Sequence, residues 1–114
     1  MIKIEYNNTV KYDNSDLCKN YVYDIDDEEV GISNSIINGI YPENGVCVNE
    51  KCKELIYVLD GEGKIVKGDE EMIFSKGDSI IIDRGEKYYW NAHCSLLAIC
   101  APKWFEEQHK VFYN

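Results

Sequence analysis

Short apolar segments separated by glycine-containing turns occupy most of this 114-residue chain. The turns recur every ~8–12 residues, and no helical period is found before about residue 103, a pattern typical of an antiparallel sandwich or barrel. β-Branched and aromatic residues are frequent in the segments between the turns, as expected for strands. The strands predicted in this way cover residues 21–25, 30–40, 55–59, 64–67, 72–74, 79–82, 88–90 and 96–101. The predicted fold class is therefore all-β.

The turns between these segments set the predicted connections. Asp60-Gly61 follows segment 55–59 and predicts a hairpin, and Gly68-Asp69-Glu70 predicts the next reversal. The region after Trp90 contains His93 and is expected to be a loop at the mouth of the barrel. Each predicted strand therefore stays short.

The length indicates one domain spanning residues 1–114, since a chain of this size builds a single core. We expect the barrel core to cover about residues 20–101. The polar segment 1–19 is expected to form an N-terminal arm or an initial strand. Residues 102–114 are expected to form a C-terminal tail or short helix.

Segment 54–59 is apolar on both faces of its predicted strand. Glu54, Ile56 and Val58 point one way, and Leu55, Tyr57 and Leu59 point the other. A strand with one solvated face alternates with polar residues, and this one does not. We therefore expect the second face to be covered, either by the N-terminal strands or by a second subunit.

Charge and cysteine content narrow the possible functions. Twenty-one acidic and twelve basic residues give a net charge of −9, which disfavours nucleic acid and acidic membranes. No segment approaches the ~20 apolar residues of a membrane span, and Met1–Glu5 lacks the apolar core of a signal peptide. We expect a cytoplasmic protein whose five cysteines are free thiols.

Two glycine-punctuated segments, 54–61 and 77–91, resemble the two sequence motifs of the cupin superfamily. The resemblance covers roughly residues 45–101. It implies a jelly-roll barrel, also called an antiparallel double-stranded β-helix, that holds a metal or a small ligand inside. It also implies a homodimer, because cupins of this size commonly pair through the outer surface of the sheet.

The resemblance breaks at the metal ligands. Metal-binding cupins carry two histidines and a glutamate in the first motif and one histidine in the second. Here only Glu54 matches: the two histidine positions of the first motif fall on Val48 and Glu50, and that of the second on Tyr88. A longer spacer would place the first two on Cys47 and Asn49.

A metal site is conceivable but is not the favoured prediction. Glu50 and Glu54 are its candidate ligands, with Cys52 expected between them on the same face and Tyr88 on the facing strand. Without imidazoles the site loses its strongest ligands for Zn, Fe or Ni, and a phenol with a pKa near ~10 is a poor replacement. We therefore predict no cofactor, leaving a divalent metal as the alternative.

The candidate ligand-binding residues surround the same positions. Tyr88 and Trp90 share one side of their strand, and the indole offers a flat surface for stacking, although both could simply fill the core. Carboxylate and amide oxygens would accept hydrogen bonds from a sugar-like polyol. The candidate set comprises Asn49, Glu50, Cys52, Glu54, Tyr88 and Trp90.

Three functions remain open. The preferred one is a small-molecule-binding cupin with a sugar-like ligand. The second is a metal-independent isomerase, epimerase or lyase with Glu54 or Glu50 as general base and Tyr88 as general acid. The third is a metal-dependent dioxygenase or decarboxylase. The C-terminal segment Trp104–His109 adds a further possibility, because His109 reaches the ligand if the tail folds across the barrel opening.

Overall fold

The computed structural model describes all residues, 1–114, and contains nine antiparallel strands and two short 3₁₀ turns. The all-β prediction is confirmed. The elements are η1 (Tyr6–Asn8), β1 (Val10–Ser15), β2 (Cys18–Tyr23), β3 (Gly31–Tyr41), β4 (Val46–Asn49), β5 (Lys53–Lys67), β6 (Glu70–Ser75), β7 (Ser79–Ile82), β8 (Lys87–Ala101), η2 (Glu106–Gln108) and β9 (His109–Phe112).

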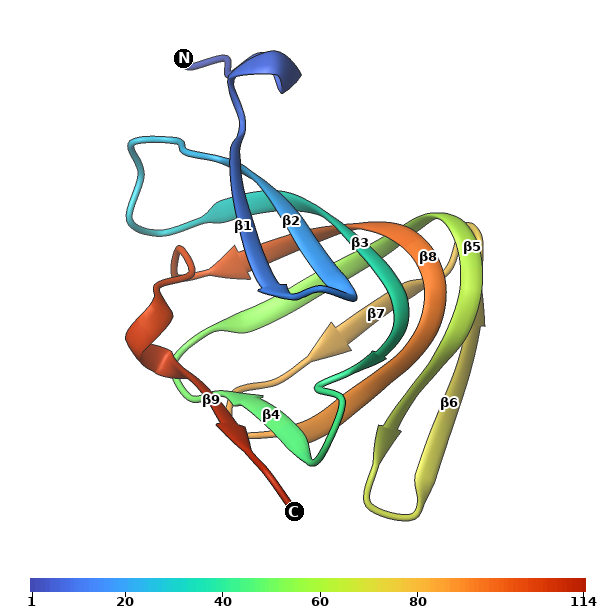
Figure 1. Cartoon of the computed structure of the whole chain (residues 1–114). Helices are drawn as coiled ribbons and strands as arrows, with labels where there is room; N and C mark the ends of the chain where they lie inside the picture. The colour runs from blue at the N-terminus through green and yellow to red at the C-terminus, as the bar shows by residue number, and fades with distance from the viewer.

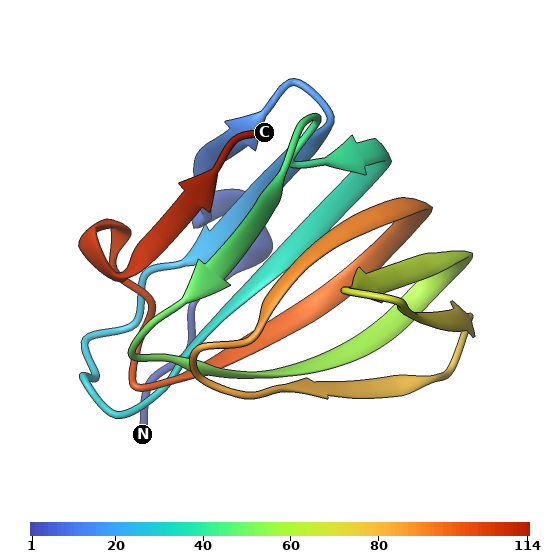
Figure 2. The same ribbon diagram turned by 90° about the horizontal axis from the view of Figure 1, so that it is seen from below.

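Strand β8 lies at the centre of the sheet. It pairs with β3 on one side and β5 on the other, while β1 and β2 continue the sheet beyond β3. Strands β6 and β7 pair with β5, and β4 joins the start of β8 to β9. The sheet curls into a jelly-roll barrel (Figures 1 and 2). The C-terminal strand β9 thereby returns beside β4, far from it in sequence.

Two predicted connections are wrong. There is no hairpin at Asp60-Gly61, because β5 continues to Lys67 and reverses at the following Gly68-Asp69 turn. A register shift between Val58 and Asp60 marks a bulge, which bends β5 across β8 without ending it. Likewise β8 runs without interruption through His93, which is an exposed strand residue and not part of a mouth loop.

The polar N-terminal segment belongs to the sheet. Its residues 10–15 form β1, and β2 begins at Cys18, so only the first residues resemble an arm. Tyr12 and Asn14 of β1 face inward, where Asn14 Nδ2 donates a hydrogen bond to the Tyr41 hydroxyl and the Tyr12 backbone carbonyl accepts one from Asn20. The C-terminal tail forms the short 3₁₀ turn η2 and the strand β9.

The core lies on the concave side of the sheet. Alternate residues of β8, from Tyr88 to Cys100, are buried there. Ile56 and Val58 of β5 are 1% and 0% exposed on the same side.

The convex side carries a set of exposed apolar side chains that we call the outer apolar face: Leu55, Tyr57, Leu59 and Ile81. The N-terminal strands do not cover it, since β1 and β2 extend the sheet beyond β3 and line the concave side. No helix of this structure has the length and apolar character needed to cross a membrane.

Candidate ligand-binding site

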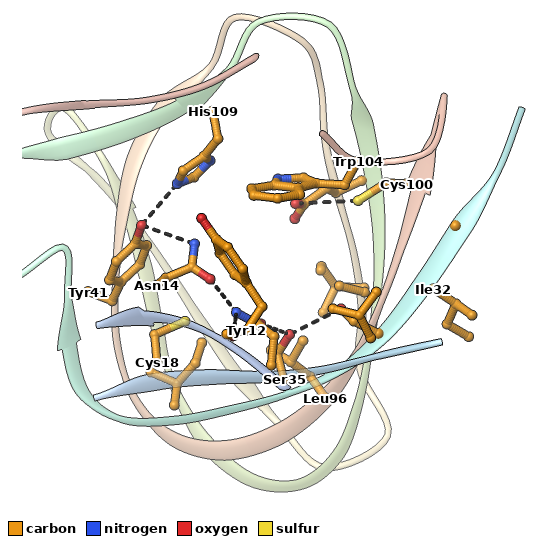
Figure 3. A pocket seen from close by; sticks show the side chains of 18 of the residues that line it. Tyr12, Asn14, Cys18, Ile32, Ser35, Tyr41, Leu96, Cys100, Trp104 and His109 are labelled. Carbon is orange, nitrogen blue, oxygen red and sulfur yellow. Dashed lines mark hydrogen bonds between the residues drawn. The ribbon is translucent and has the colours of Figure 1, made fainter. Parts of the chain in front are cut away.

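A cavity of about 110 Å³ lies on the concave side of the sheet, and we call it the inner cavity. Strands β1, β2, β3, β5 and β8 form its walls, and the C-terminal tail forms the rest (Figure 3). Fourteen of its 22 lining residues are hydrophobic, so its polar groups are few and stand out. Polar groups set against apolar walls are typical of small-molecule sites.

Three of the six candidate residues line the inner cavity. Glu54 enters from β5, and Tyr88 and Trp90 enter from β8. The Tyr88 ring meets the Trp90 ring edge-on at a centroid distance of 6.2 Å, and Phe74 packs against the other side of Trp90 at 5.6 Å. Trp90 is 5% exposed, so it fills the core and also forms part of the cavity wall.

The other three candidates lie outside the lining. Asn49 is buried at the end of β4 and donates hydrogen bonds to Glu54 and Tyr88. Cys52 is fully buried, with its Sγ 3.9 Å from the Lys103 carbonyl oxygen. Glu50 is exposed in the bend between β4 and β5. The expectation that Glu50 and Glu54 share one face is therefore wrong, because the bend interrupts the extended segment between them.

The Glu54 carboxyl is held at one oxygen. Oε1 accepts a hydrogen bond from Asn49 Nδ2 at 3.0 Å and a weaker one from Cys100 Sγ at 3.7 Å. Both contacts end at Oε1, so Oε2 has no hydrogen-bond partner within the chain. Burial raises the pKa of Glu54, and the two donors offset part of that rise.

The orientation of the Asn49 amide follows from the backbone. Gln108 Oε1 accepts from the backbone N–H groups of Lys51 and Cys52, both at 3.1 Å, and these groups can only donate. Gln108 Nε2 therefore donates to Asn49 Oδ1 at 2.9 Å. The Asn49 Nδ2 group must then face Glu54 and Tyr88, which it reaches at 3.0 and 3.5 Å.

The same reasoning assigns the proton of His109. Its Nδ1 lies 2.9 Å from Asn49 Oδ1, an acceptor, so Nδ1 carries a proton. Burial lowers the pKa of His109, which favours the neutral ring with Nε2 as an acceptor. Tyr41 then donates its hydroxyl proton to Nε2 at 2.9 Å.

These bonds continue through the N-terminal strands (Figure 3). Asn14 Nδ2 donates to the Tyr41 hydroxyl at 3.2 Å, and Asn20 Nδ2 donates to Asn14 Oδ1. Ser35 Oγ donates to Asn20 Oδ1 at 2.5 Å, and Asn20 also donates to the Tyr12 carbonyl, which fixes its orientation. One directed chain of hydrogen bonds thus runs from Ser35 to Glu54, and we call it the polar chain.

Aromatic side chains from both ends of the protein flank the mouth of the inner cavity. Tyr12 of β1 and Trp104 of the tail meet edge-on at 5.3 Å, and the Trp104 ring lies 5.8 Å from that of His109. Tyr12 lies between Trp104 and Tyr41 in the view of Figure 3. The tail thus folds over the opening and brings His109 to the cavity wall.

Sequence reasoning missed the residues of β1 and β2 that line the cavity. Their pattern was mixed and polar, and the only signal was the alternation of Tyr12 with Asn14. The aromatic and histidine residues of the tail stand out in the sequence, but the path of the tail over the mouth depends on tertiary structure.

A second hollow of about 400 Å³ lies between β6 and β7, and Tyr88 lines it as well. Its rim carries Lys67 and Glu86, which pair with each other at 2.8 Å. Because Glu54 and the polar chain lie at the inner cavity, we regard the inner cavity as the candidate site.

The donor set does not fit the metal that the cupin resemblance implies. The positions of its ligands hold apolar Val48, exposed Glu50 and Tyr88, whose pKa burial raises well above its ordinary value. No group of three or more His, Cys, Asp or Glu side chains is arranged to hold a metal ion. Glu54 alone would be a weak ligand.

Glu54→Gln is expected to stabilise the protein at neutral pH. Gln keeps an acceptor oxygen for Asn49 and Cys100 but has no charge to bury. The pKa of Glu54 is raised in the folded state. The stability that Glu54 contributes to the wild type is therefore fully present below its ordinary pKa of 4.5 and is lost as pH rises through its folded-state pKa. Urea unfolding should therefore show equal stabilities near pH 4 and a more stable variant at pH 7. A variant less stable than the wild type at pH 7 would contradict the burial of this charge.

Comparisons with known proteins agree with the fold. A family model described as a cupin domain matches residues 46–100. No curated protein matches the sequence. Among solved structures, Pac13, described as a nucleoside dehydratase, has a TM-score of 0.87 at 14% identity, covering 99% of this chain and 92% of that chain.

Two further structures share the architecture. Ectoine synthase from P. lautus has a TM-score of 0.77 at 18% identity, covering 98% of this chain and 90% of its own. The polyketide cyclase RemF from Streptomyces resistomycificus has a TM-score of 0.68 at 14% identity, covering 95% and 89%. Together with the curled antiparallel sheet and the match over both glycine-punctuated motifs, these likenesses show that the chain has the fold of a small cupin.

Proposed function

We propose that this cupin binds a small polar metabolite with a sugar-like face inside the inner cavity, without a metal ion. The observation that carries the proposal is the half-buried Glu54 carboxyl, whose Oε2 faces no partner within the chain. Because Glu54 is half-buried, its free Oε2 stays accessible from the cavity, where a ligand can contact it.

The size and lining of the cavity support a small ligand of this kind. Its volume of about 110 Å³ lies below the ~300–1,000 Å³ of drug-sized pockets, so a larger ligand must extend through the mouth. Trp104 and Tyr12 offer ring faces for a sugar, and hydroxyl groups can donate to Glu54 Oε2. A structure of Streptomyces PAC13 with uridine, a sugar-bearing molecule, has a TM-score of 0.86 to this chain at 14% identity, covering 98% of this chain and 91% of that one.

A metal-independent lyase, isomerase or epimerase is the second candidate. The observation that favours it is the raised pKa of Glu54, because a general base works best with a pKa near the operating pH. Tyr88 stays protonated and is the candidate acid. Glu50 is exposed outside the cavity, so the base role falls to Glu54. Neighbours described as a nucleoside dehydratase and a polyketide cyclase are compatible with this chemistry.

The test is a binding screen with a matched pair of variants. We expect uridine or one of a panel of monosaccharides to raise the melting temperature of the wild type, since a ligand that binds the folded form stabilises it. Glu54→Gln should lose most of the shift. Glu50→Gln, which removes an exposed carboxylate, should keep it. A shift that survives in Glu54→Gln would remove the proposed contact, and product analysis with the same ligands tests for catalysis.

The partner proposed besides the ligand is a second copy of this chain. The outer apolar face leaves Tyr57 48% and Ile81 64% exposed, and contiguous apolar surfaces of this kind mark interfaces. Light scattering should give twice the chain mass of 13.2 kDa. Tyr57→Glu should yield monomers, whereas Val10→Glu, an exposed apolar position on β1, should not. A monomeric wild type would refute the dimer.

A further inference from the structure

The Glu54 carboxyl has no cationic partner in the protein. None of the six ion pairs includes it. Lys103, which lines the inner cavity, directs its Nζ away to Asp24 at 2.9 Å and to the Ile25 carbonyl at 2.7 Å. Arg84 Nε donates to the Lys51 carbonyl at 2.9 Å. Lys103 and Arg84 are therefore engaged elsewhere, and Lys51 is exposed in the bend between β4 and β5.

His109 does not supply the missing charge either. The polar chain assigns its Nδ1 proton to Asn49 and makes its Nε2 the acceptor for Tyr41. A second proton on Nε2 would turn the Tyr41 hydroxyl from donor into acceptor and leave its own proton without this partner, and burial also lowers the pKa of His109. The histidine nearest to Glu54 in the polar chain is thus held neutral, with only the Asn49 amide between them.

The remaining titratable neighbours of Glu54 are neutral as well. Burial raises the pKa of each of them, to about 12 for two of the thiols, so none carries a charge at neutral pH. These neighbours are Cys18 of β2, Cys47 of β4, Cys52 of the β4–β5 bend, and Tyr88 and Cys100 of β8. An ionised Glu54 is consequently a lone charge in a largely apolar cavity, which is an unfavourable arrangement unless a counter-charge arrives.

The surroundings of the cavity suit a cation. The rings of Tyr12 and Trp104, which meet edge-on, both line the inner cavity, and aromatic rings attract ammonium groups. The net charge of −9 raises the local concentration of cations around the whole molecule. By contrast, a carboxylate or phosphate would meet Glu54 with no free basic group to balance it.

We infer that the metabolite bound in the inner cavity carries a protonated amine, which forms an ion pair with Glu54 Oε2 beneath the Tyr12 and Trp104 rings. This inference rests on the proposed function and narrows its ligand from neutral polyols to aminated ones, such as an amino sugar. The ligand nitrogen supplies the counter-charge that the chain itself lacks.

The ion pair has a proton signature. Burial raises the pKa of Glu54 in the free protein, and an arriving ammonium group lowers it again by favouring the ionised carboxylate. Binding of the amine should therefore release a proton from Glu54. Calorimetry in two buffers of different ionisation enthalpy measures that release.

The experiment uses methylammonium and methanol as the smallest matched probes, and glucosamine and glucose as larger ones. Methylammonium should shift the carboxyl ¹³C resonance of Glu54 and lower its apparent pKa, whereas methanol should do neither. Glucosamine should bind at least about tenfold more tightly than glucose, as expected for a desolvated charge pair. Glu54→Gln should abolish that preference, and Glu50→Gln should retain it.

The outcomes separate the two proposals. If glucose binds as tightly as glucosamine, or if methylammonium leaves the Glu54 signal unchanged while a neutral sugar binds, the amine inference is wrong and the proposed function stands. A preference for glucosamine that survives in Glu54→Gln also overturns the inference, because the amine then pairs elsewhere. If neither the amines nor the neutral sugars bind, the proposed function fails together with the inference.

Discussion

Gly61→Ala is expected to destabilise the protein by about 4 kcal/mol, enough to unfold much of a marginally stable domain. Gly61 has φ +86°, in the left-handed region, and a Cβ built there would lie 2.1 Å from the His93 carbonyl oxygen and 2.7 Å from the Cys94 Cα. The clash is with the backbone of β8, which cannot move aside as a flexible side chain could. Urea unfolding followed by tryptophan fluorescence measures the loss.

Gly77→Ala is the matched control. Gly77 also has a positive φ, +91°, but nothing lies within 4 Å of its added Cβ. Gly77→Ala should therefore lower the free energy of unfolding by only about 1–2 kcal/mol, from backbone strain alone. Equal losses in the two variants would mean that β5 does not cross β8 closely at Gly61.

Asn49→Leu should lower the free energy of unfolding by about 3 kcal/mol, although Leu is similar in size and more apolar. The change leaves Gln108 Nε2 and His109 Nδ1 without their shared acceptor, and each buried unpaired group costs about 1–3 kcal/mol. It also removes the 3.0 Å donor to Glu54. The pKa of Glu54 should rise further as a result. A pH titration of the Glu54 carboxyl ¹³C resonance in the folded variant measures this rise.

Asn38→Leu serves as the control for this substitution. Asn38 is exposed on β3, and its side chain makes no hydrogen bond within the protein, so the change should fall within about 0.5 kcal/mol of wild type. A similarly small effect for Asn49→Leu would show that the Asn49 amide does not organise the site.

The strands could be predicted from the sequence because alternation and turn chemistry are local. The alternation of Glu54, Ile56 and Val58 placed these side chains on one face, and they do lie on the concave side. The expectation that Glu54 and Tyr88 share one hollow agrees with their positions, since the cupin motifs fix where those two strands cross. The role of these residues in binding stays a prediction.

Other features depend on contacts that no local pattern records. The glycine at position 61 favours a turn prediction because glycine is common in hairpins. In the structure, Gly61 adopts its positive φ next to a bulge inside a continuous strand. An extended segment would place Glu50 beside Glu54, but the bend at residues 50–52 turns Glu50 to solvent.

The polar chain lay furthest from prediction. Its bonds join Asn49 to His109 across 60 sequence positions and Tyr41 to His109 across 68. Polar residues of β1 and β2 enter the same chain, although their composition was that of an exposed arm. Side chains so far apart in sequence meet only because the tail crosses the mouth of the barrel.

The state of His109 tests the whole arrangement most directly. A ¹⁵N spectrum of the two imidazole nitrogens at neutral pH reports which of them carries the proton, and His93→Gln identifies the signals by removing the other histidine. We predict a neutral His109 with its proton on Nδ1, donating to Asn49 and accepting from Tyr41 at Nε2. A proton on Nε2 alone would contradict the account, because the polar chain would then not run toward Glu54. Protons on both nitrogens would contradict it as well, because the protein itself would hold a charge beside that carboxyl.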